Sequence, residues 1–368
     1  MKRLIAVILT VIILSSAVSA GASGPPALSA ACAILVDGES GRVLFGQNVH
    51  EERAIASITK LMTALVAAEH AQSLEEEVVV RPEWTGIEGS SIYLKPGEVV
   101  TLKVLLYGLM LNSGNDAAVA IAGHCAGDVE TFVGWMNDRA AELGMEHTCF
   151  KNPNGLSEDG HYSTAYDMAL LARECSRNET VAEIVSTRSV ALGTRTFTNH
   201  NKLLWRYEGC TGMKTGYTEK AGRTLVSSAQ RNGQTLIAVT LHAPNDWSDH
   251  AALFDYGFES FPRRMLCRGG KVIGRVPVQG GLVPGVSVMT AEDVYYPLQE
   301  GETAEARIEL VEYVEAPVEK GVVLGTLTFV RDGEVIGETD LLASSAVHCN
   351  QEQSKNLLER VRGFLHRE

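Results

Sequence analysis

The segment Ser57-Ile58-Thr59-Lys60 opens a helical pattern that continues to His70, with Leu61 and Leu65 on its apolar face. Residues i and i+3 share one face of a helix, so the lysine ammonium can reach the serine hydroxyl. A serine hydroxyl becomes a good nucleophile when a base removes its proton. This pair therefore predicts the reactive centre of an acyl-transfer site, at the start of a helix whose N–H groups favour developing negative charge.

The lysine can act as a base only in its neutral form. Burial and a second nearby cation both lower the pKa of a lysine, and Lys214 is the candidate for that cation. Alone, the spacing is a weak signal, because a serine that caps a helix before a surface lysine has the same pattern. Ser57 is nevertheless the only serine in the chain with a lysine three residues later.

The string Ser113-Gly114-Asn115 lies between two predicted helices, Leu102–Leu111 and Asp116–Ala126. A loop between helices can project a hydroxyl and an amide into a cleft. We expect Ser113 to relay a proton to the leaving amine and Asn115 to hold the backbone amide of the substrate. Helix capping is the competing interpretation, since the same pattern recurs at Ser176-Arg177-Asn178.

The string Lys214-Thr215-Gly216 opens a predicted strand–turn–strand segment. A cation beside a hydroxyl suits a carboxylate ligand. A glycine on an edge strand lets a peptide approach as an added strand, and the Tyr217 N–H could join that of Ser57 in an oxyanion hole. A surface hairpin that contains a lysine is the alternative. Because the three strings each fall at an element boundary, their combination favours a catalytic site that needs no metal or cofactor.

Composition sets the class of the protein. The chain has 368 residues, enough for two domains, and its hydrophobic content of 45% is typical of a globular protein. The net charge of −13 argues against nucleic-acid binding. Seven scattered cysteines without a C-x-x-C pair argue against both a zinc site and a disulfide framework, although they leave room for one disulfide.

The N-terminus predicts export. Lys2 and Arg3 precede an apolar run from Leu4 to Leu14, and small residues follow up to a cleavage site at Val18-Ser19-Ala20. We therefore expect residues 1–20 to be a signal peptide, with an uncleaved anchor as the alternative. The mature protein would act at the outer face of the cytoplasmic membrane, in the cell wall or in the periplasm.

Residues 28–262 are expected to form one α/β (α+β) domain, with helices packed on an antiparallel sheet. The predicted strands are Ala31–Val36, Arg42–Phe45, Gly222–Ala229 and Gln234–Leu241, and the further helices are Val129–Leu143, Ala165–Arg177 and Ser248–Tyr256. Thr164 is the expected N-cap of the helix that follows it.

Residues 265–346 carry short Val/Leu/Thr runs between turn residues, including the Asp-Gly turn at Asp332, and predict a small all-β sandwich domain. The segment 351–368 predicts an amphipathic C-terminal helix. This helix either anchors the protein peripherally to a membrane or docks on its own domain.

The three strings and the sequence around them resemble those of the low-molecular-mass penicillin-binding proteins that act as serine-type D-alanyl-D-alanine carboxypeptidases. The resemblance covers residues 28 to 262, and the β-rich domain also fits the layout of this family. It implies a β-lactamase/transpeptidase-like fold for the first domain. The matching segments are Ala56–Thr63, Gly89–Leu94, Ser113–Ala117, Asn152–Leu156, Gly212–Thr218 and Phe254–Phe258.

The resemblance also implies a substrate and roles. Ser57 would be acylated by the penultimate D-Ala carbonyl of a peptidoglycan stem pentapeptide ending in D-Ala-D-Ala, with Lys60 as base and Ser113 as proton relay. Lys214 and Thr215 would recognise the terminal carboxylate. β-Lactam antibiotics would acylate the same serine, and peptidoglycan synthesis, wall turnover and cell shape would be the processes served.

The chain differs from the family's usual sequence in two places. Many relatives have histidine where this chain has Tyr217, which bears on the rate of deacylation. Some relatives place an arginine shortly before the segment that corresponds to Phe254–Phe258. This chain has Pro244-Asn245-Asp246-Trp247 there, so no arginine is assigned to substrate binding.

Three other functions fit part of the pattern. A class A-like serine β-lactamase needs a deacylating glutamate on a loop between the second and third strings. Glu158 and Glu174 lie in that interval, but neither sits in a convincing loop motif. A non-hydrolytic penicillin-sensing or wall-binding protein would keep an intact acylation site without turnover. A D,D-endopeptidase that acts on peptidoglycan cross-links is a variant of the carboxypeptidase hypothesis.

Overall fold

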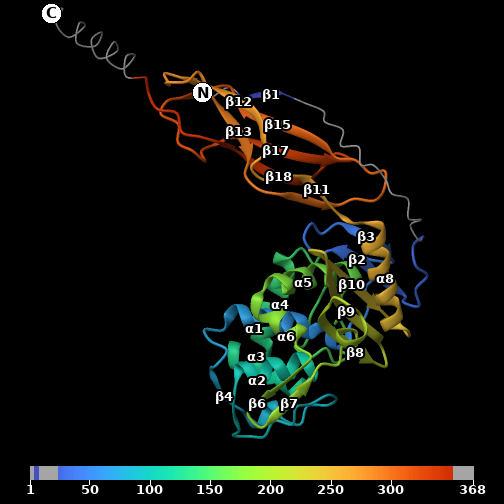
Figure 1. Ribbon diagram of the computed structural model, residues 1–368. Helices are drawn as coiled ribbons and strands as arrows, with labels where there is room; N and C mark the ends of the chain where they lie inside the picture. Colours follow the sequence, from blue (N-terminus) through green and yellow to red (C-terminus); the bar gives the residue numbers. More distant parts are fainter. Residues whose placement is uncertain (1–3, 8–23, 351–368) are drawn as a thin grey trace, which may run out of the picture. The chain divides into compact units, whose positions relative to one another are not determined.

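The computed structural model describes residues 4–7 and 24–350, and its contacts divide the chain into two compact units (Figure 1). Among the described residues, the larger unit comprises residues 24–262, and the smaller comprises residues 4–7 and 263–350. The predicted helix over 351–368 lies outside the described residues. So does most of the predicted signal peptide, of which only Leu4–Val7 are described, as strand β1.

The larger unit is built on a five-stranded antiparallel sheet in the order β3-β2-β10-β9-β8. Its strands are β2 (Cys32–Asp37), β3 (Val43–Gln47), β8 (Cys210–Thr218), β9 (Gly222–Arg231) and β10 (Gln234–Leu241). The four predicted strands with stated bounds are confirmed to within two residues at each end, whereas the strand predicted to open at Lys214 begins earlier, at Cys210. β8, which carries the third string, occupies one edge of the sheet.

Helices cover both faces of this sheet, with α8 on one side and a larger helical block on the other (Figure 1). The helices are α1 (Lys60–His70), α2 (Leu102–Leu111), α3 (Asn115–Ala126), α4 (Val129–Glu142), α5 (Ala165–Arg177), α6 (Glu179–Ser186), α7 (Leu203–Arg206) and α8 (Asp246–Ser260). Strand side chains alternate between faces, so Ile34 and Val36 join the core under the helical block while Leu35 joins the core under α8.

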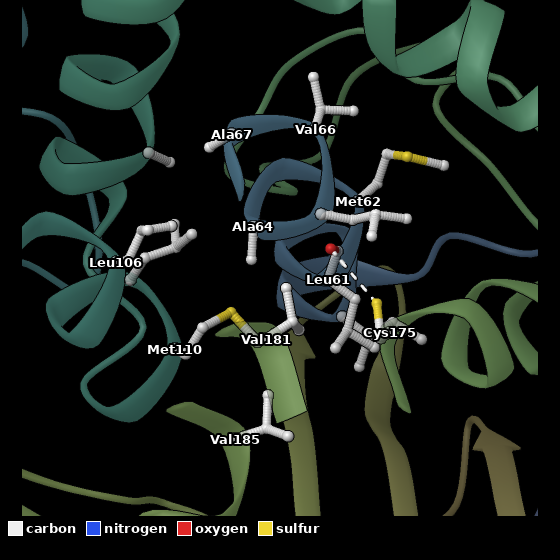
Figure 2. Close-up of a cluster of buried hydrophobic side chains, with 14 of the residues drawn as sticks. Leu61, Met62, Ala64, Val66, Ala67, Leu106, Met110, Cys175, Val181 and Val185 are labelled. Atoms are coloured by element: carbon white, nitrogen blue, oxygen red, sulfur yellow. Dashed lines mark hydrogen bonds between the residues drawn. The ribbon is translucent and has the colours of Figure 1, made fainter. Parts of the chain in front are cut away.

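Helix α1 is the centre of the helical block. Every residue from Lys60 to Ala67 is buried, so the helix is enclosed on all sides rather than on one stripe. Figure 2 shows its side chains surrounded by those of α2 and α6, and the Cys175 thiol of α5 donates to the Leu61 carbonyl at 3.7 Å. A residue placed at the start of α1 is therefore buried by its neighbours, whatever its own polarity.

Some elements differ from the sequence prediction. The predicted helix from Ser57 begins instead as the 3-10 turn η1 (Ala56–Thr59), and α8 is longer than predicted by two residues at its start and four at its end. The short elements α6, α7, η2 (Pro82–Trp84) and the hairpins β4–β5 and β6–β7 were not predicted, because periodicity is weak over so few residues. The hairpin strands are β4 (Glu77–Val79), β5 (Val99–Thr101), β6 (Ser189–Leu192) and β7 (Arg195–Thr198).

The predicted N-cap at Thr164 is confirmed. Its hydroxyl accepts a hydrogen bond from the Asp167 backbone N–H at 3.0 Å, at the start of α5. The Asp167 carboxylate in turn accepts hydrogen bonds from the His147 backbone and the Thr148 hydroxyl. All seven cysteines lie within the described residues and are free thiols.

The smaller unit is all-β, as predicted. Its main sheet has the order β1-β15-β17-β18-β13-β12-β16, and β11 pairs with β14 in a separate two-stranded sheet. The strands are β11 (Arg263–Cys267), β12 (Val272–Gln279), β13 (Gly285–Thr290), β14 (Val294–Pro297), β15 (Glu305–Val311), β16 (Val314–Glu315), β17 (Val323–Arg331) and β18 (Glu334–Ala343). The predicted Asp332-Gly333 turn joins β17 to β18.

One buried histidine connects α8 to the sheet. The two ring nitrogens of His250 hydrogen-bond the Ser227 hydroxyl of β9 and the Thr240 hydroxyl of β10, the latter at 2.9 Å. Burial lowers the pKa of His250 to about 3. The imidazole is therefore neutral in the folded protein across the ordinary pH range.

We predict that His250 makes the larger unit less stable in acid. Between pH 6.5 and 3 the unfolded chain protonates this residue and the folded chain does not, so the free energy of unfolding falls as pH falls, by up to about 1.4 kcal/mol per pH unit. His250→Gln should flatten the slope of that free energy against pH between 6 and 4, measured by urea unfolding. All four tryptophans lie between residues 84 and 247, so their fluorescence reports on this unit alone.

His50→Gln, at an exposed histidine of the same unit, is the control for the loss of an imidazole as such. A slope in His250→Gln equal to that of the wild type would contradict the prediction.

Candidate active site

Ser57 and Lys60 are brought together by the tight turn that precedes α1. Side chains three residues apart eclipse one another in a 3-10 turn, and Ser57 lies within η1 while Lys60 follows it directly. The Lys60 Nζ lies 2.9 Å from the Ser57 Oγ. The lysine is thus within hydrogen-bond reach of the hydroxyl that it would deprotonate.

Lys60 is fully buried at the first position of α1. Its Nζ also donates to the Asn115 Oδ1 at 2.7 Å and to the Asn154 backbone carbonyl at 2.5 Å. Burial holds the pKa of Lys60 well below its ordinary value, and the positive charge of Lys214 lowers it further, while Asp116 opposes the shift. An ammonium that loses its proton readily in this way is suited to act as a base.

The second string forms the loop between α2 and α3. Ser113 lines the same cavity as Ser57. Asn115 begins α3, and its side chain connects two groups: Oδ1 accepts from Lys60, and Nδ2 donates to the Glu88 carbonyl at 2.6 Å. Asn115 therefore holds the lysine, a contact that the sequence analysis did not anticipate. Its expected hydrogen bond to a substrate amide stays a prediction.

The loop that faces this string is fixed by a buried carboxylate. Asp116 accepts hydrogen bonds from the backbone N–H groups of Ile92 and Leu94 and from the Ser91 hydroxyl. The Asn115 backbone N–H donates to the Ser90 carbonyl at 2.7 Å. The start of α3 therefore holds the loop 89–94 in place, and Ser90 within this loop lines the cavity.

The third string lies on edge strand β8, against η1. A Cβ added at Gly216 would lie 3.0 Å from the Ser57 backbone nitrogen and would collide with the Thr224 hydroxyl, so only glycine permits this approach. Lys214 is buried, and its Nζ donates to the Thr215 carbonyl at 2.9 Å. Burial lowers the pKa of Lys214 to about 7.

Each of the three strings contains or follows a strained residue. Ala56, Ser113 and Met213 all have positive φ angles, of 52°, 61° and 94°, although none of them is glycine. Such a conformation costs about 1–3 kcal/mol per residue and persists only where the surrounding structure enforces it. Three of the eight non-glycine residues with positive φ in the described part of the chain therefore lie at the sequence motifs.

A cavity of about 370 Å³ joins these elements. Of the eight site residues predicted from sequence, Ser57, Ser113, Thr215, Gly216 and Tyr217 line it, while Lys60, Asn115 and Lys214 are buried. The full lining is Ser57, Ser90, Ser113, His200, Lys202, Thr215, Gly216, Tyr217, Arg223, Asp246 and Trp247.

Several lining residues were missed by the sequence analysis. His200 and Lys202 come from the segment before α7, which Asn201 ties to β8 through a hydrogen bond to the Gly212 carbonyl. Arg223 stands directly opposite Tyr217 in the β8–β9 pairing. Pairing the residues on either side of the turn after Tyr217 as a hairpin would have placed Arg223 opposite Tyr217. No local sequence pattern points to His200 or Lys202.

The two glutamates considered for a β-lactamase lie in other environments. Glu158 accepts a hydrogen bond from the Asn152 side chain, and Glu174 pairs with Arg139 at 2.7 Å. Within the described part of the chain, no glutamate lines the cavity. The second Ser-x-Asn string is a helix junction, where the Asn178 side chain caps α6.

Comparison with known proteins identifies the family of this chain. A family model described as D-alanyl-D-alanine carboxypeptidase matches residues 19–245, and one described as the C-terminal domain of penicillin-binding protein 5 matches residues 261–348. The chain is 34% identical over 365 residues to the D-alanyl-D-alanine carboxypeptidase DacF of Bacillus subtilis, covering 93% of this chain and 94% of that protein. It is also 34% identical to DacA of Escherichia coli K12, over 87% of this chain and 84% of that protein.

A solved structure extends the likeness to the whole fold. Penicillin-binding protein 5 of Haemophilus influenzae matches with a TM-score of 0.73 at 30% identity, over 89% of this chain and 99% of that one. The expected transpeptidase-like α/β domain and all-β C-terminal domain are both confirmed by these likenesses. The chain belongs to the family of the serine-type D-alanyl-D-alanine carboxypeptidases.

Proposed function

We propose that this carboxypeptidase removes the terminal D-alanine from peptidoglycan stem pentapeptides through an acyl-enzyme on Ser57. The observation that carries the proposal is the contact of 2.9 Å between the Ser57 hydroxyl and a fully buried Lys60. No other serine in the chain has a lysine at this spacing, and this one faces a cavity large enough for a dipeptide end.

In the acylation step, Lys60 takes the proton from Ser57 as Oγ bonds to the penultimate D-Ala carbonyl carbon. The backbone N–H groups of Ser57 and Tyr217 stabilise the oxyanion. The C–N bond then breaks as the proton held by Lys60 passes through the Ser113 hydroxyl to the leaving amine, which departs as free D-alanine. In deacylation, water attacks the ester carbonyl and loses a proton to Lys60. Lys60 then protonates the Ser57 Oγ as the ester C–O bond breaks, and the shortened peptide leaves with a free carboxylate.

The substrate would bind as an added strand along β8. This strand lies at the sheet edge, so its outer backbone groups can pair with an extended peptide. Gly216 brings that edge against Ser57, and Thr215 lines the cavity above the buried Lys214, where a carboxylate would find a hydroxyl and a cation.

Peptidoglycan lies outside the cytoplasm, so this substrate requires export by the predicted signal peptide over residues 1–20. The predicted tail helix over 351–368 would then contact the membrane peripherally. Among the helices that the structure describes, none has both the length and the apolar composition to span a bilayer.

The decisive measurement is D-alanine release from a pentapeptide ending in D-Ala-D-Ala. We expect release by the wild type and none by Ser57→Ala, with a fluorescent penicillin labelling only the wild type. Labelling at Ser57 without release would instead indicate the penicillin-sensing or wall-binding protein. Release from a dimeric cross-linked muropeptide would add the endopeptidase activity.

Lys60→Arg keeps a positive charge but removes the group that can become neutral. We expect kcat/KM for the pentapeptide to fall by about 10²- to 10⁴-fold, as for loss of a general base. In the wild type, kcat/KM should rise with pH as Lys60 loses its proton, at a pH well below that of an ordinary lysine. Lys103→Arg, at a surface lysine paired with Glu75, is the control; an active Lys60→Arg would exclude this base.

β-Lactams should form a long-lived acyl-enzyme, because no glutamate in the described residues lines the cavity to activate water. Intact-protein mass spectrometry after a pulse of benzylpenicillin should show one adduct that persists for many minutes. The adduct should be absent from Ser57→Ala. Rapid steady turnover of penicillin would favour a β-lactamase instead.

A further inference from the structure

The cavity wall beyond Tyr217 carries an arginine that no sequence motif includes. Arg223 comes from β9, and it stands opposite Tyr217 in the antiparallel pairing with β8. Residues directly opposite one another in such a pair project from the same face of the sheet. The guanidinium therefore lies beside the strand that would bind the substrate, and both side chains line the cavity with Ser57.

Two neighbours hold this guanidinium in place. The Arg223 Nη2 lies 2.9 Å from the Asp246 Oδ2, and the guanidinium carbon lies 5.6 Å from the centre of the Trp247 ring. Asp246 is itself fixed, since its other oxygen accepts from the Trp247 backbone N–H at the start of α8 and only 2% of its side chain is exposed. The arginine is thus oriented before any ligand arrives.

Arg223 keeps donors free for a ligand. A guanidinium carries five N–H donors in a planar fork, and the pairing with Asp246 uses one edge of it. The side chain remains 41% exposed, whereas its acidic partner is almost completely covered. A second carboxylate can therefore approach the open edge of the guanidinium from the cavity.

The two candidate cations of the site differ in how well they serve a carboxylate. Lys214 is buried, and burial lowers its pKa to about 7, so near neutral pH its charge is only partly present before substrate binds. One of its protons is also engaged by the Thr215 carbonyl. Arg223 is always charged, is partly exposed, and offers bidentate geometry that matches a carboxylate.

We propose that Arg223 binds the terminal carboxylate of the substrate and of β-lactams, with Asp246 and Trp247 as its positioning residues. This inference rests on the proposed function and assigns to β9 a carboxylate-binding group that complements Thr215 on β8. The sequence around Pro244–Trp247 offers no arginine for carboxylate binding. In this proposal Arg223, on the preceding strand β9, supplies it instead.

The test compares ligands with and without the negative charge. Acylation rates of Ser57 by benzylpenicillin and by its methyl ester are followed by intact-protein mass spectrometry at millimolar ligand over hours. Arg223→Gln should lower the second-order rate with the free acid by about 10- to 100-fold, the size expected for a charge-assisted hydrogen bond, and change the rate with the ester little. Arg223→Lys should fall between the wild type and Arg223→Gln.

A double variant separates binding from repulsion. Arg223→Gln leaves the Asp246 carboxylate without its cation, and that charge alone could repel the ligand. Arg223→Gln combined with Asp246→Asn removes both charges, and it should remain as slow with the free acid as the single variant. Arg81→Gln is the matched control, because the Arg81 guanidinium lies 5.0 Å from the Trp84 ring and does not line the cavity.

The outcomes distinguish this inference from the function on which it rests. Wild-type protein that is not acylated at all would overturn the role of Ser57. If the wild type is acylated normally but Arg223→Gln slows acylation by the acid and by the ester equally, the role of Arg223 is overturned. The proposed role of Ser57 would then still stand. The role of Arg223 would also be overturned if the double variant recovered the wild-type acylation rate with the free acid. The same holds if Arg223→Gln reacted with the free acid as fast as the wild type.

Discussion

The burial of Lys60 is the constraint on which the rest of this structure depends. An ammonium taken out of water is costly unless it finds acceptors, and here it finds the Ser57 hydroxyl, the Asn115 side chain and the Asn154 carbonyl. These three groups come from three separate segments of the chain. Their convergence explains why η1, the α2–α3 loop and the loop around Asn154 must all be held in register around the first residue of α1.

That convergence is achieved with strain and with close packing. Ala56, Ser113 and Met213 adopt left-handed backbone conformations at the three motifs, and Gly216 admits contact between β8 and η1 that any side chain would prevent. The hydrophobic cores on the two faces of the sheet supply the free energy that keeps these conformations populated. The elements that support the site are thus themselves part of these cores.

The charges around the cavity follow a simple division. The buried lysines have lowered pKa values, whereas the guanidinium of an arginine is permanently charged, and a nearly covered aspartate orients that of Arg223 at the cavity wall. Proton transfer and carboxylate binding therefore make opposite demands on a cation. The protein meets them by placing one kind of group beneath the cavity and the other on its wall.

The sequence by itself determined a great deal about this protein. The alternating strands and helical patterns predicted the α/β sheet domain and the all-β second unit, because these features are local and periodic. The three strings supplied the eight candidate site residues, of which five line one cavity and three lie buried. Only the tertiary structure decided that Asn115 holds Lys60 and that His200 and Arg223 reach the cavity. Those contacts join residues far apart in the chain or across a strand pair, and their distances depend on packing that no local pattern encodes.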